Sequence, residues 1–222
     1  MKTNWKAVVT GASRGLGAAL SEALAARGIE VALVARSADA LNEVVTRIRK
    51  NGGRAHAIVA DVADKDATYR IAGEAMAAMG SVDLLVHNAS ALGPTPLQLL
   101  LDTDCEDLEA VLQTNVVGAF RLTRALVGPM VLRGSGVVVQ ISSDAAVQPY
   151  ERWGLYGASK AAGDQLTRIL AAEVKASGVR VITFDPGEMD TQMHAEAMPE
   201  ADPSMLARPS DVAARLIREL FE

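Results

Sequence analysis

Apolar residues in this chain form short continuous runs that alternate with segments of helical spacing. Such runs are typical of strands that are covered on both faces, and their alternation with helices favours right-handed crossovers and a parallel sheet. The pattern predicts a doubly wound α/β fold of six or seven strands with helices on both faces, in one domain over residues 1–222. The predicted strands are Lys6–Thr10, Glu30–Ala35, Ala55–Ala60, Val82–His87, Gly136–Ile141 and Val179–Phe184. The predicted helices lie near 15–27, 38–51, 64–79, 105–128, 155–177 and 209–220.

Two predicted connections are long, residues 89–104 and 185–208. Both follow strands, and ligands in open α/β sheets bind beyond the carboxyl ends of the strands. We therefore expect the two connections to enclose a substrate, the second as a mobile lid. The alternative is a pair of ordinary surface insertions.

The composition argues against several classes of protein and of site. The net charge is −5 over 222 residues, which argues against a nucleic-acid partner, because duplex binding needs clustered Lys and Arg. The single cysteine, Cys105, cannot form an internal disulfide, and its acidic neighbours disfavour a nucleophilic thiolate. No run is apolar for long enough to span a membrane, and the N-terminal stretch is too short for a signal peptide. No spacing of ligands suggests a metal. We expect a cytoplasmic protein.

A glycine-rich turn, TGASRGLG over residues 10–17, follows the first strand and opens the first helix. Gly11 permits a tight turn, Gly15 lets backbone N–H groups approach a pyrophosphate at the helix N-terminus, and Gly17 lets the helix lie close to the sheet. At the start of a strand–helix–strand unit, this predicts a dinucleotide site of the Rossmann type. A merely structural turn is the alternative.

The second strand indicates which dinucleotide binds. An NAD site needs an acidic residue near the end of this strand, but Arg36 and Ser37 stand there, and Arg14 lies in the glycine turn. Two guanidinium groups suit a 2′-phosphate, so we predict NADP. Alternatively, Arg36 is only a solvated charge. Asp61, after the third strand, either accepts a bond from the adenine amino group or caps a helix.

Four side chains form a candidate catalytic group. Tyr156 and Lys160 are spaced i, i+4 and share a helix face, where an ammonium lowers the pKa of a phenol and makes it a plausible general acid/base. Ser143 ends the fifth strand. Asn115 lies on an apolar helical face, where its amide needs a partner. That partner is either functional or simply the backbone of a neighbouring strand.

Taken together, these motifs resemble the short-chain dehydrogenase/reductase family from Thr10 to Thr191. The spacing from serine to tyrosine matches the family for Ser143 rather than Ser142. The matching positions are Thr10–Gly17, Asp61-Val62, Asn88-Ala89, Asn115, Ser143, Tyr156-x-x-x-Lys160 and Pro186-Gly187-x-x-x-Thr191.

The resemblance implies a residue-by-residue mechanism. Tyr156 would give a proton to the substrate carbonyl oxygen, and Ser143 would polarise that oxygen. Lys160 would hold the nicotinamide ribose and lower the tyrosine pKa, and Asn115 would anchor a water for proton resupply. The implied NADP-binding residues are Gly11, Ser13, Arg14, Gly15, Leu16, Gly17, Arg36, Asp61, Val62, Asn88, Ala89, Tyr156, Lys160, Pro186, Gly187, Met189 and Thr191.

The chain departs from the family pattern at several places. His87 and Ser90 flank Asn88-Ala89 where the family usually has Asn and Gly. His87, at the end of a buried strand, is better interpreted as a core histidine than as a catalytic one. Glu188 replaces a commoner hydrophobic residue and faces either substrate or solvent. The family's usual last strand is missing after the final helix, so we expect a homodimer in place of the usual tetramer.

The residues near the catalytic group favour a small apolar or aromatic carbonyl or alcohol substrate. A sugar-nucleotide epimerase is a rival with the same tyrosine–lysine pair, but the chain lacks room for its larger substrate region. A non-catalytic NADP-binding sensor is the second rival. The candidate pocket residues are Leu92, Pro94, Ala145, Tyr150, Trp153, Met189, Met193 and Met198.

Overall fold

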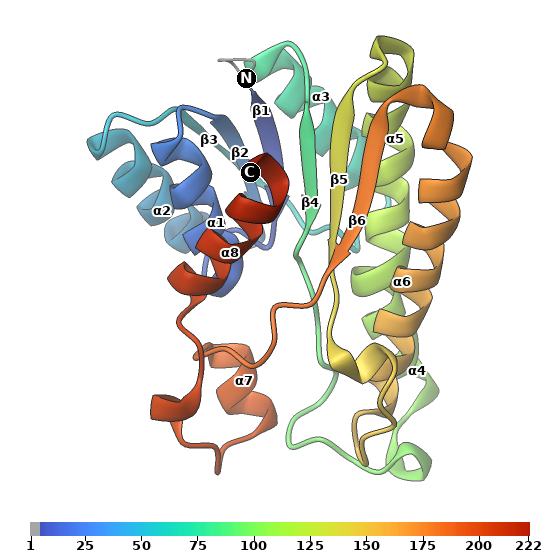
Figure 1. Ribbon diagram of the computed structural model, residues 1–222. Helices are drawn as coiled ribbons and strands as arrows, with labels where there is room; N and C mark the ends of the chain where they lie inside the picture. Colours follow the sequence, from blue (N-terminus) through green and yellow to red (C-terminus); the bar gives the residue numbers. More distant parts are fainter. Residues whose placement is uncertain (1–4) are drawn as a thin grey trace.

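A computed structural model describes residues 5–222 and shows six parallel strands in one sheet (Figure 1). The strand order is β3-β2-β1-β4-β5-β6, so successive strands are added on one side of β1 up to β3 and on its other side from β4 onward. This confirms the predicted α/β fold of the Rossmann type. The strands are β1 (Lys6–Thr10), β2 (Glu30–Ala35), β3 (Ala55–Val59), β4 (Leu84–His87), β5 (Gly136–Ile141) and β6 (Val179–Phe184).

Helices cover both faces of the sheet, and each face has its own apolar core (Figure 1). On one face Leu24, Leu41 and Leu216 pack with the apolar side chains of β1, β2 and β5. On the other face Ile71 and Leu126 pack beneath Val8 and other strand residues. The first face carries α1 (Gly15–Ala26), α2 (Ala38–Lys50) and α8 (Pro209–Phe221), and the second carries α3 (Ala67–Met79), α5 (Ala119–Arg133) and α6 (Gly154–Glu173).

The helix predicted over 105–128 is longer and less regular than expected. It begins as α4 (Cys105–Leu112), passes through a π-helical segment (Gln113–Gly118) and continues as α5 to Arg133, where Gly134 ends it in a left-handed conformation. A Cβ at Gly118 would come within 2.3 Å of the Val62 carbonyl oxygen, so the segment is pressed against the loop after β3. The wider turn therefore accompanies a close tertiary contact.

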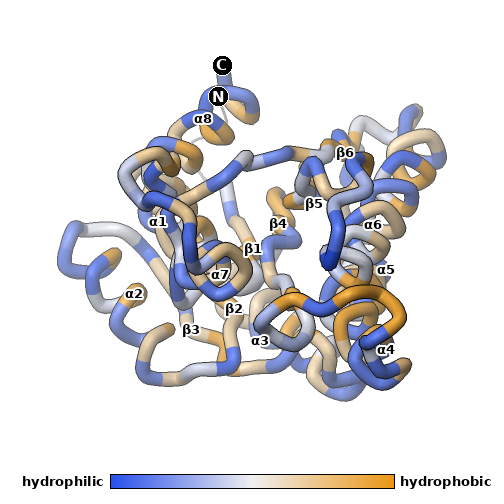
Figure 2. The backbone as a smooth tube through the Cα atoms, turned by 90° about the horizontal axis from the view of Figure 1, so that it is seen from below, coloured by the Kyte–Doolittle hydropathy of each residue, from blue (hydrophilic) through white to orange (hydrophobic). Residues whose placement is uncertain are grey.

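The long connections also contain structure that the sequence pattern did not predict. Residues 185–208 include α7 (Gln192–Ala197), which Thr191 caps by accepting a hydrogen bond from the His194 N–H at 3.2 Å. The Arg14 side chain hydrogen-bonds Gln192, which ties α7 to the glycine turn. Seen from below in Figure 2, α7 lies at the carboxyl-end side of the sheet. Both long connections thus lie beyond the carboxyl ends of the strands, where the site was expected (Figure 1).

No helix within residues 5–222 is long and apolar enough to cross a membrane. The N-terminal stretch was judged too short for a signal peptide, and its first four residues lie outside the described part of the chain.

Candidate active site

The glycine turn has the conformation that its sequence predicts. Gly11 and Gly15 have φ values of +65° and +54°, which only glycine adopts readily. A Cβ at Gly17 would lie 2.3 Å from the Gly11 carbonyl oxygen, so only glycine lets α1 approach this closely. No side chain in the described part of the chain caps the start of α1. The backbone N–H groups there suit a pyrophosphate, so the turn fits a dinucleotide.

Thr10 and Asn88 hold this turn against the end of β4. The Thr10 Oγ1 accepts hydrogen bonds from the N–H groups of Asn88 at 3.0 Å and Ala89 at 3.1 Å. The Asn88 Nδ2 donates to the carbonyl oxygens of Thr10 at 2.9 Å and Gly11 at 3.1 Å. Asn88 thus shapes the cofactor turn through its side chain. Thr10 has the same bracing role, which its place in the motif did not reveal.

The two arginines expected at the 2′-phosphate make separate contacts. Arg36 lies 3.8 Å from Asp61, and its side chain is 78% exposed. Arg14 hydrogen-bonds Gln192 of α7 instead. Asp61 accepts a hydrogen bond from the Ala63 N–H at 2.9 Å and closes a turn. The helix-cap alternative for Asp61 is wrong, because α3 begins later, at Ala67.

The first two turns of α6 bring Tyr156 and Lys160 to the end of β5. Both side chains are buried, with Tyr156 9% and Lys160 3% exposed. The Lys160 Nζ lies 5.3 Å from the centre of the tyrosine ring and donates a hydrogen bond to the Ile141 carbonyl oxygen at 2.8 Å. Ser143 stands just past β5 and caps the short turn that follows, accepting from the Ala145 N–H at 3.2 Å. The predicted serine, tyrosine and lysine thus meet at one place.

Burial dominates the ionisation of this pair. It raises the pKa of Tyr156 to about 12, although the nearby hydroxyls of Ser143 and Ser90 act in the opposite direction. It also lowers the pKa of Lys160 to about 8, although the carboxylate of Asp164 acts against this. The tyrosine pKa therefore moves opposite to the direction expected from the lysine alone. The reason is that burial removes the phenolate from water.

Asn115 is fully engaged by protein groups. Its Oδ1 accepts from the Ala91 N–H at 2.7 Å, and its Nδ2 donates to the Ala91 carbonyl oxygen at 2.9 Å and to Ser159 Oγ at 2.8 Å. Ser159 in turn donates to the Tyr156 carbonyl oxygen at 2.7 Å. The side chain thus makes the structural hydrogen bonds considered as the alternative, although to the loop after β4 rather than to a strand. It connects that loop to α6.

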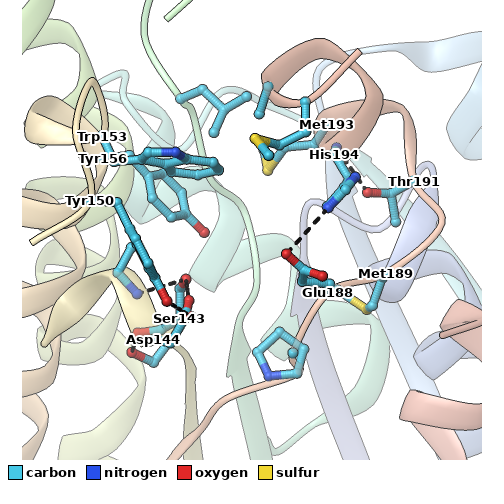
Figure 3. Close-up of a pocket in the computed structure, with 17 residues that line it drawn as sticks. Ser143, Asp144, Tyr150, Trp153, Tyr156, Glu188, Met189, Thr191, Met193 and His194 are labelled. Atoms are coloured by element: carbon cyan, nitrogen blue, oxygen red, sulfur yellow. Dashed lines mark hydrogen bonds and ion pairs between the residues drawn. The ribbon is translucent and has the colours of Figure 1, made fainter. Parts of the chain in front are cut away.

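A cavity of about 230 Å³ opens beside Tyr156 and Ser143 (Figure 3). Every pocket residue expected from sequence lines it, except Pro94. Glu188 also lines it, with its side chain 76% exposed and 3.9 Å from the His194 ring. Sequence reasoning missed His194 and Asp144, whose positions depend on how the segments after β6 and β5 fold. The lining residues are Leu92, Ser142, Ser143, Asp144, Ala145, Tyr150, Trp153, Tyr156, Pro186, Gly187, Glu188, Met189, Thr191, Met193, His194, Ala197 and Met198.

His87 lies in the core, outside this cavity. It is 5% exposed, and its Nε2 lies 2.8 Å from Thr123 Oγ1. Burial lowers its pKa to about 4, so the ring is neutral at physiological pH. Within the described residues, no group of three or more His, Cys, Asp or Glu side chains is placed to hold a metal ion.

Comparisons with known proteins agree with this geometry. The family model for short chain dehydrogenases matches residues 6–202. A short chain dehydrogenase of Pseudocercospora fijiensis is 37% identical over 194 residues, which make up 85% of this chain and 61% of that protein. The chain thus covers less than two thirds of that relative. A 3-oxoacyl-[acyl-carrier-protein] reductase of Synechocystis is 35% identical over 216 residues, covering 95% of this chain and 86% of that protein.

A solved structure extends the likeness to three dimensions. The alcohol dehydrogenase of Thermococcus sibiricus, complexed with 5-hydroxy-NADP, has a TM-score of 0.88 and 27% identity, covering 98% of this chain and 90% of that one. The sheet order, the glycine turn and the tyrosine–lysine pair are thus accompanied by similarity along most of the sequence. The chain belongs to the short chain dehydrogenase family and is an oxidoreductase.

Proposed function

We propose that this protein transfers a hydride between NADP(H) and a small carbonyl or alcohol substrate, with Tyr156 as the general acid/base. The observation that carries the proposal is the meeting of Tyr156 and Ser143 at one wall of the cavity, with Lys160 buried behind the tyrosine ring. A proton donor, a hydrogen-bonding hydroxyl and a fixed positive charge are the groups that carbonyl reduction needs.

Each side chain has a separate task in this proposal. The bound nicotinamide supplies or accepts the hydride. Tyr156 donates its proton to the carbonyl oxygen, and Ser143 donates a hydrogen bond to the same oxygen. Lys160 is positively charged below about pH 8 and stabilises the phenolate that Tyr156 becomes. Asn115 positions α6 through its bonds to Ala91 and Ser159.

The preference for NADP over NAD is proposed on charge. Arg36 follows β2, where an NAD site would carry an acidic residue, and Arg14 lies in the glycine turn. The exposed Arg36 side chain is only weakly held at 3.8 Å from Asp61, so it can reorient toward a 2′-phosphate. Ser37 adds a hydroxyl. The complex of the Thermococcus sibiricus enzyme with 5-hydroxy-NADP supports the same cofactor class.

The remaining parts of the cofactor site follow the family motif. The pyrophosphate would lie on the N–H groups of the glycine turn, and Asp61 would face the adenine. Thr191 and the backbone near Gly187 would hold the carboxamide. Gly187 has a φ of +72°, and a Cβ there would meet nothing within 4 Å, so the backbone is open to a ligand at this point.

We also propose a cytoplasmic homodimer. The α5 and α6 faces carry small residues, among them Ala119 and Ala161, together with the partly exposed Phe120, Leu166 and Ile169. Two such faces can pair around a two-fold axis. The molecular mass in solution tests the dimer directly, and a monomeric mass contradicts it.

The activity is tested with a panel of aldehydes, ketones and diketones, following NADPH oxidation, while NADPH affinity is measured separately by calorimetry. We expect turnover of at least one small apolar or aromatic carbonyl compound. Tight NADPH binding without turnover across the panel would favour the rival function, a cofactor-binding sensor.

A further inference from the structure

Asp144 connects two residues of the cavity wall. Its Oδ2 accepts a hydrogen bond from the Tyr150 hydroxyl at 2.7 Å, and its Oδ1 accepts one from the Ser143 hydroxyl at 3.0 Å. Figure 3 shows the three side chains together at one wall of the cavity. The hydrogen bond from Tyr150 to the carboxylate is also the main reason why the pKa of that phenol is raised.

This network restricts what Ser143 can do. A serine hydroxyl has a single proton, and here that proton is directed to Asp144. The same proton cannot be donated to a carbonyl oxygen at the same time. A substrate group that donates a hydrogen bond to Asp144 in place of Ser143 would release the serine hydroxyl for the carbonyl oxygen. A carboxylate also has about four acceptor sites, so Asp144 can bind a further donor while it keeps Tyr150.

The charges around the cavity favour the same kind of substrate. Asp144 and Glu188 are its two acidic lining residues, and no Lys or Arg of the described chain lines it. Among the described residues, His194 is the one basic side chain that lines the cavity, and it lies beside Glu188. The rings of Tyr150 and Trp153 complete the wall next to Asp144, and aromatic faces attract cations. An anionic group would meet the carboxylates of Asp144 and Glu188, and His194, the one basic lining side chain of the described residues, already lies beside Glu188.

We propose that Asp144 is a specificity-determining residue that binds a hydrogen-bond-donating group of the carbonyl substrate. The preferred substrates carry a protonated amine or a hydroxyl near the carbonyl, and substrates with a carboxylate at that place are disfavoured. The proposal rests on the proposed function, since it concerns the substrate of that same site. Asp144 takes no proton in the reaction and acts only through recognition and through Ser143.

Binding of three matched probes tests the proposal without turnover. Protonated benzylamine, benzyl alcohol and benzoate have the same ring and differ in the group they offer. Calorimetry on the NADPH-loaded protein should give affinities in the order benzylamine, benzyl alcohol, benzoate. Asp144→Asn should reduce the ratio of benzylamine to benzoate affinity about tenfold, as expected for the loss of a charge-assisted hydrogen bond. Equal binding of benzylamine and benzoate to the wild type would overturn the proposal.

Two further variants separate charge from packing. Glu43→Gln removes the same charge from the exposed face of α2 and should leave the ratio unchanged. Tyr150→Phe removes a hydroxyl but keeps the carboxylate of Asp144, so the preference for benzylamine should persist. If Tyr150→Phe abolishes the preference as completely as Asp144→Asn does, the packing of the wall rather than its charge is responsible and the proposal fails.

Turnover gives the second arm of the test. An aminomethyl or hydroxymethyl ketone should have a higher kcat/KM than a keto acid of the same size, and Asp144→Asn should reduce that advantage. If ketones are reduced without this advantage, the inference about Asp144 fails while the proposed function stands. If no carbonyl compound is reduced, the proposed function fails, and the order of probe binding still decides whether Asp144 selects donors.

Discussion

The Lys160 Nζ lies 5.3 Å from the ring centre of Tyr156, and both side chains are buried at the end of β5. Their i, i+4 spacing on α6 sets this relationship, and the hydrogen bond from Lys160 to the Ile141 carbonyl oxygen fixes the lysine against the sheet. A buried ammonium is costly, because it has left water. The proposed catalytic group therefore reduces the stability of the fold.

Lys160→Met should abolish carbonyl reduction and stabilise the protein. The pKa of Lys160 falls from 10.5 to about 8 on folding, which corresponds to about 3 kcal/mol. The substitution also removes the hydrogen bond to Ile141, which costs about 1 kcal/mol of stability. The free energy of unfolding should therefore rise by about 2 kcal/mol at pH 7. Urea denaturation measures this change.

The same substitution has a pH signature. Between pH 8 and 10 the unfolded lysine binds a proton that the folded one has lost, so this group makes the wild type more stable as pH rises. The advantage of Lys160→Met should therefore shrink from pH 7 to pH 10. A constant difference would mean that the lysine is not destabilised by burial.

Arg36→Asp should move cofactor preference from NADPH toward NADH. The change removes a guanidinium that suits the 2′-phosphate and places a carboxylate where it can accept from a ribose 2′-hydroxyl. The ratio of kcat/KM values for the two cofactors should shift about tenfold or more. Arg168→Asp, which changes an exposed arginine on α6, is the charge-matched control. An unchanged ratio in Arg36→Asp would refute the phosphate assignment.

His87 should make the protein sensitive to acid. Its pKa is 6.5 in the unfolded chain and about 4 when buried, so the unfolded state takes up a proton first as pH falls through this window. As pH falls from 6.5 to 4, this group should lower the free energy of unfolding by about 3 kcal/mol in all. His87→Gln keeps a partner for Thr123 but does not titrate, so its stability should fall less from pH 6.5 to 4. Parallel curves for the two proteins would contradict the assignment.

Asn115→Ala should destabilise the protein by about 2–4 kcal/mol. It removes three hydrogen bonds and leaves the N–H and carbonyl groups of Ala91 without that partner inside the protein. Thermal and urea unfolding measure this loss. Unchanged stability with reduced turnover would show instead that the amide acts mainly in proton supply.

Much of the fold could be predicted because its signals are local. Continuous apolar runs marked the strands, and the conformation of Gly11 and the close approach at Gly17 follow from the glycine spacing. The i, i+4 pair likewise needed only a helix. These features depend on neighbours in the chain, which a single sequence displays.

The features that were missed depend on tertiary contacts. The π-helical segment accompanies the contact between Gly118 and the Val62 carbonyl, and α7 lies within a connection for which no helix was predicted. The approach of Glu188 to His194 and the hydrogen bonds of Asp144 each form within one loop, and they depend on the conformation that the loop takes in the folded protein. The net rise of the Tyr156 pKa also depends on burial, which the spacing of two residues does not give.

The central claim is that Tyr156 supplies the proton for carbonyl reduction, and Tyr156→Phe tests it most directly. The substitution removes one hydroxyl and keeps the ring that packs against Trp153 with a centroid distance of 5.6 Å. With a carbonyl compound that the wild type reduces, NADPH oxidation should fall at least about a hundredfold, as expected for the loss of a general acid. NADPH affinity measured by calorimetry should change little. Retained turnover in Tyr156→Phe would contradict the account.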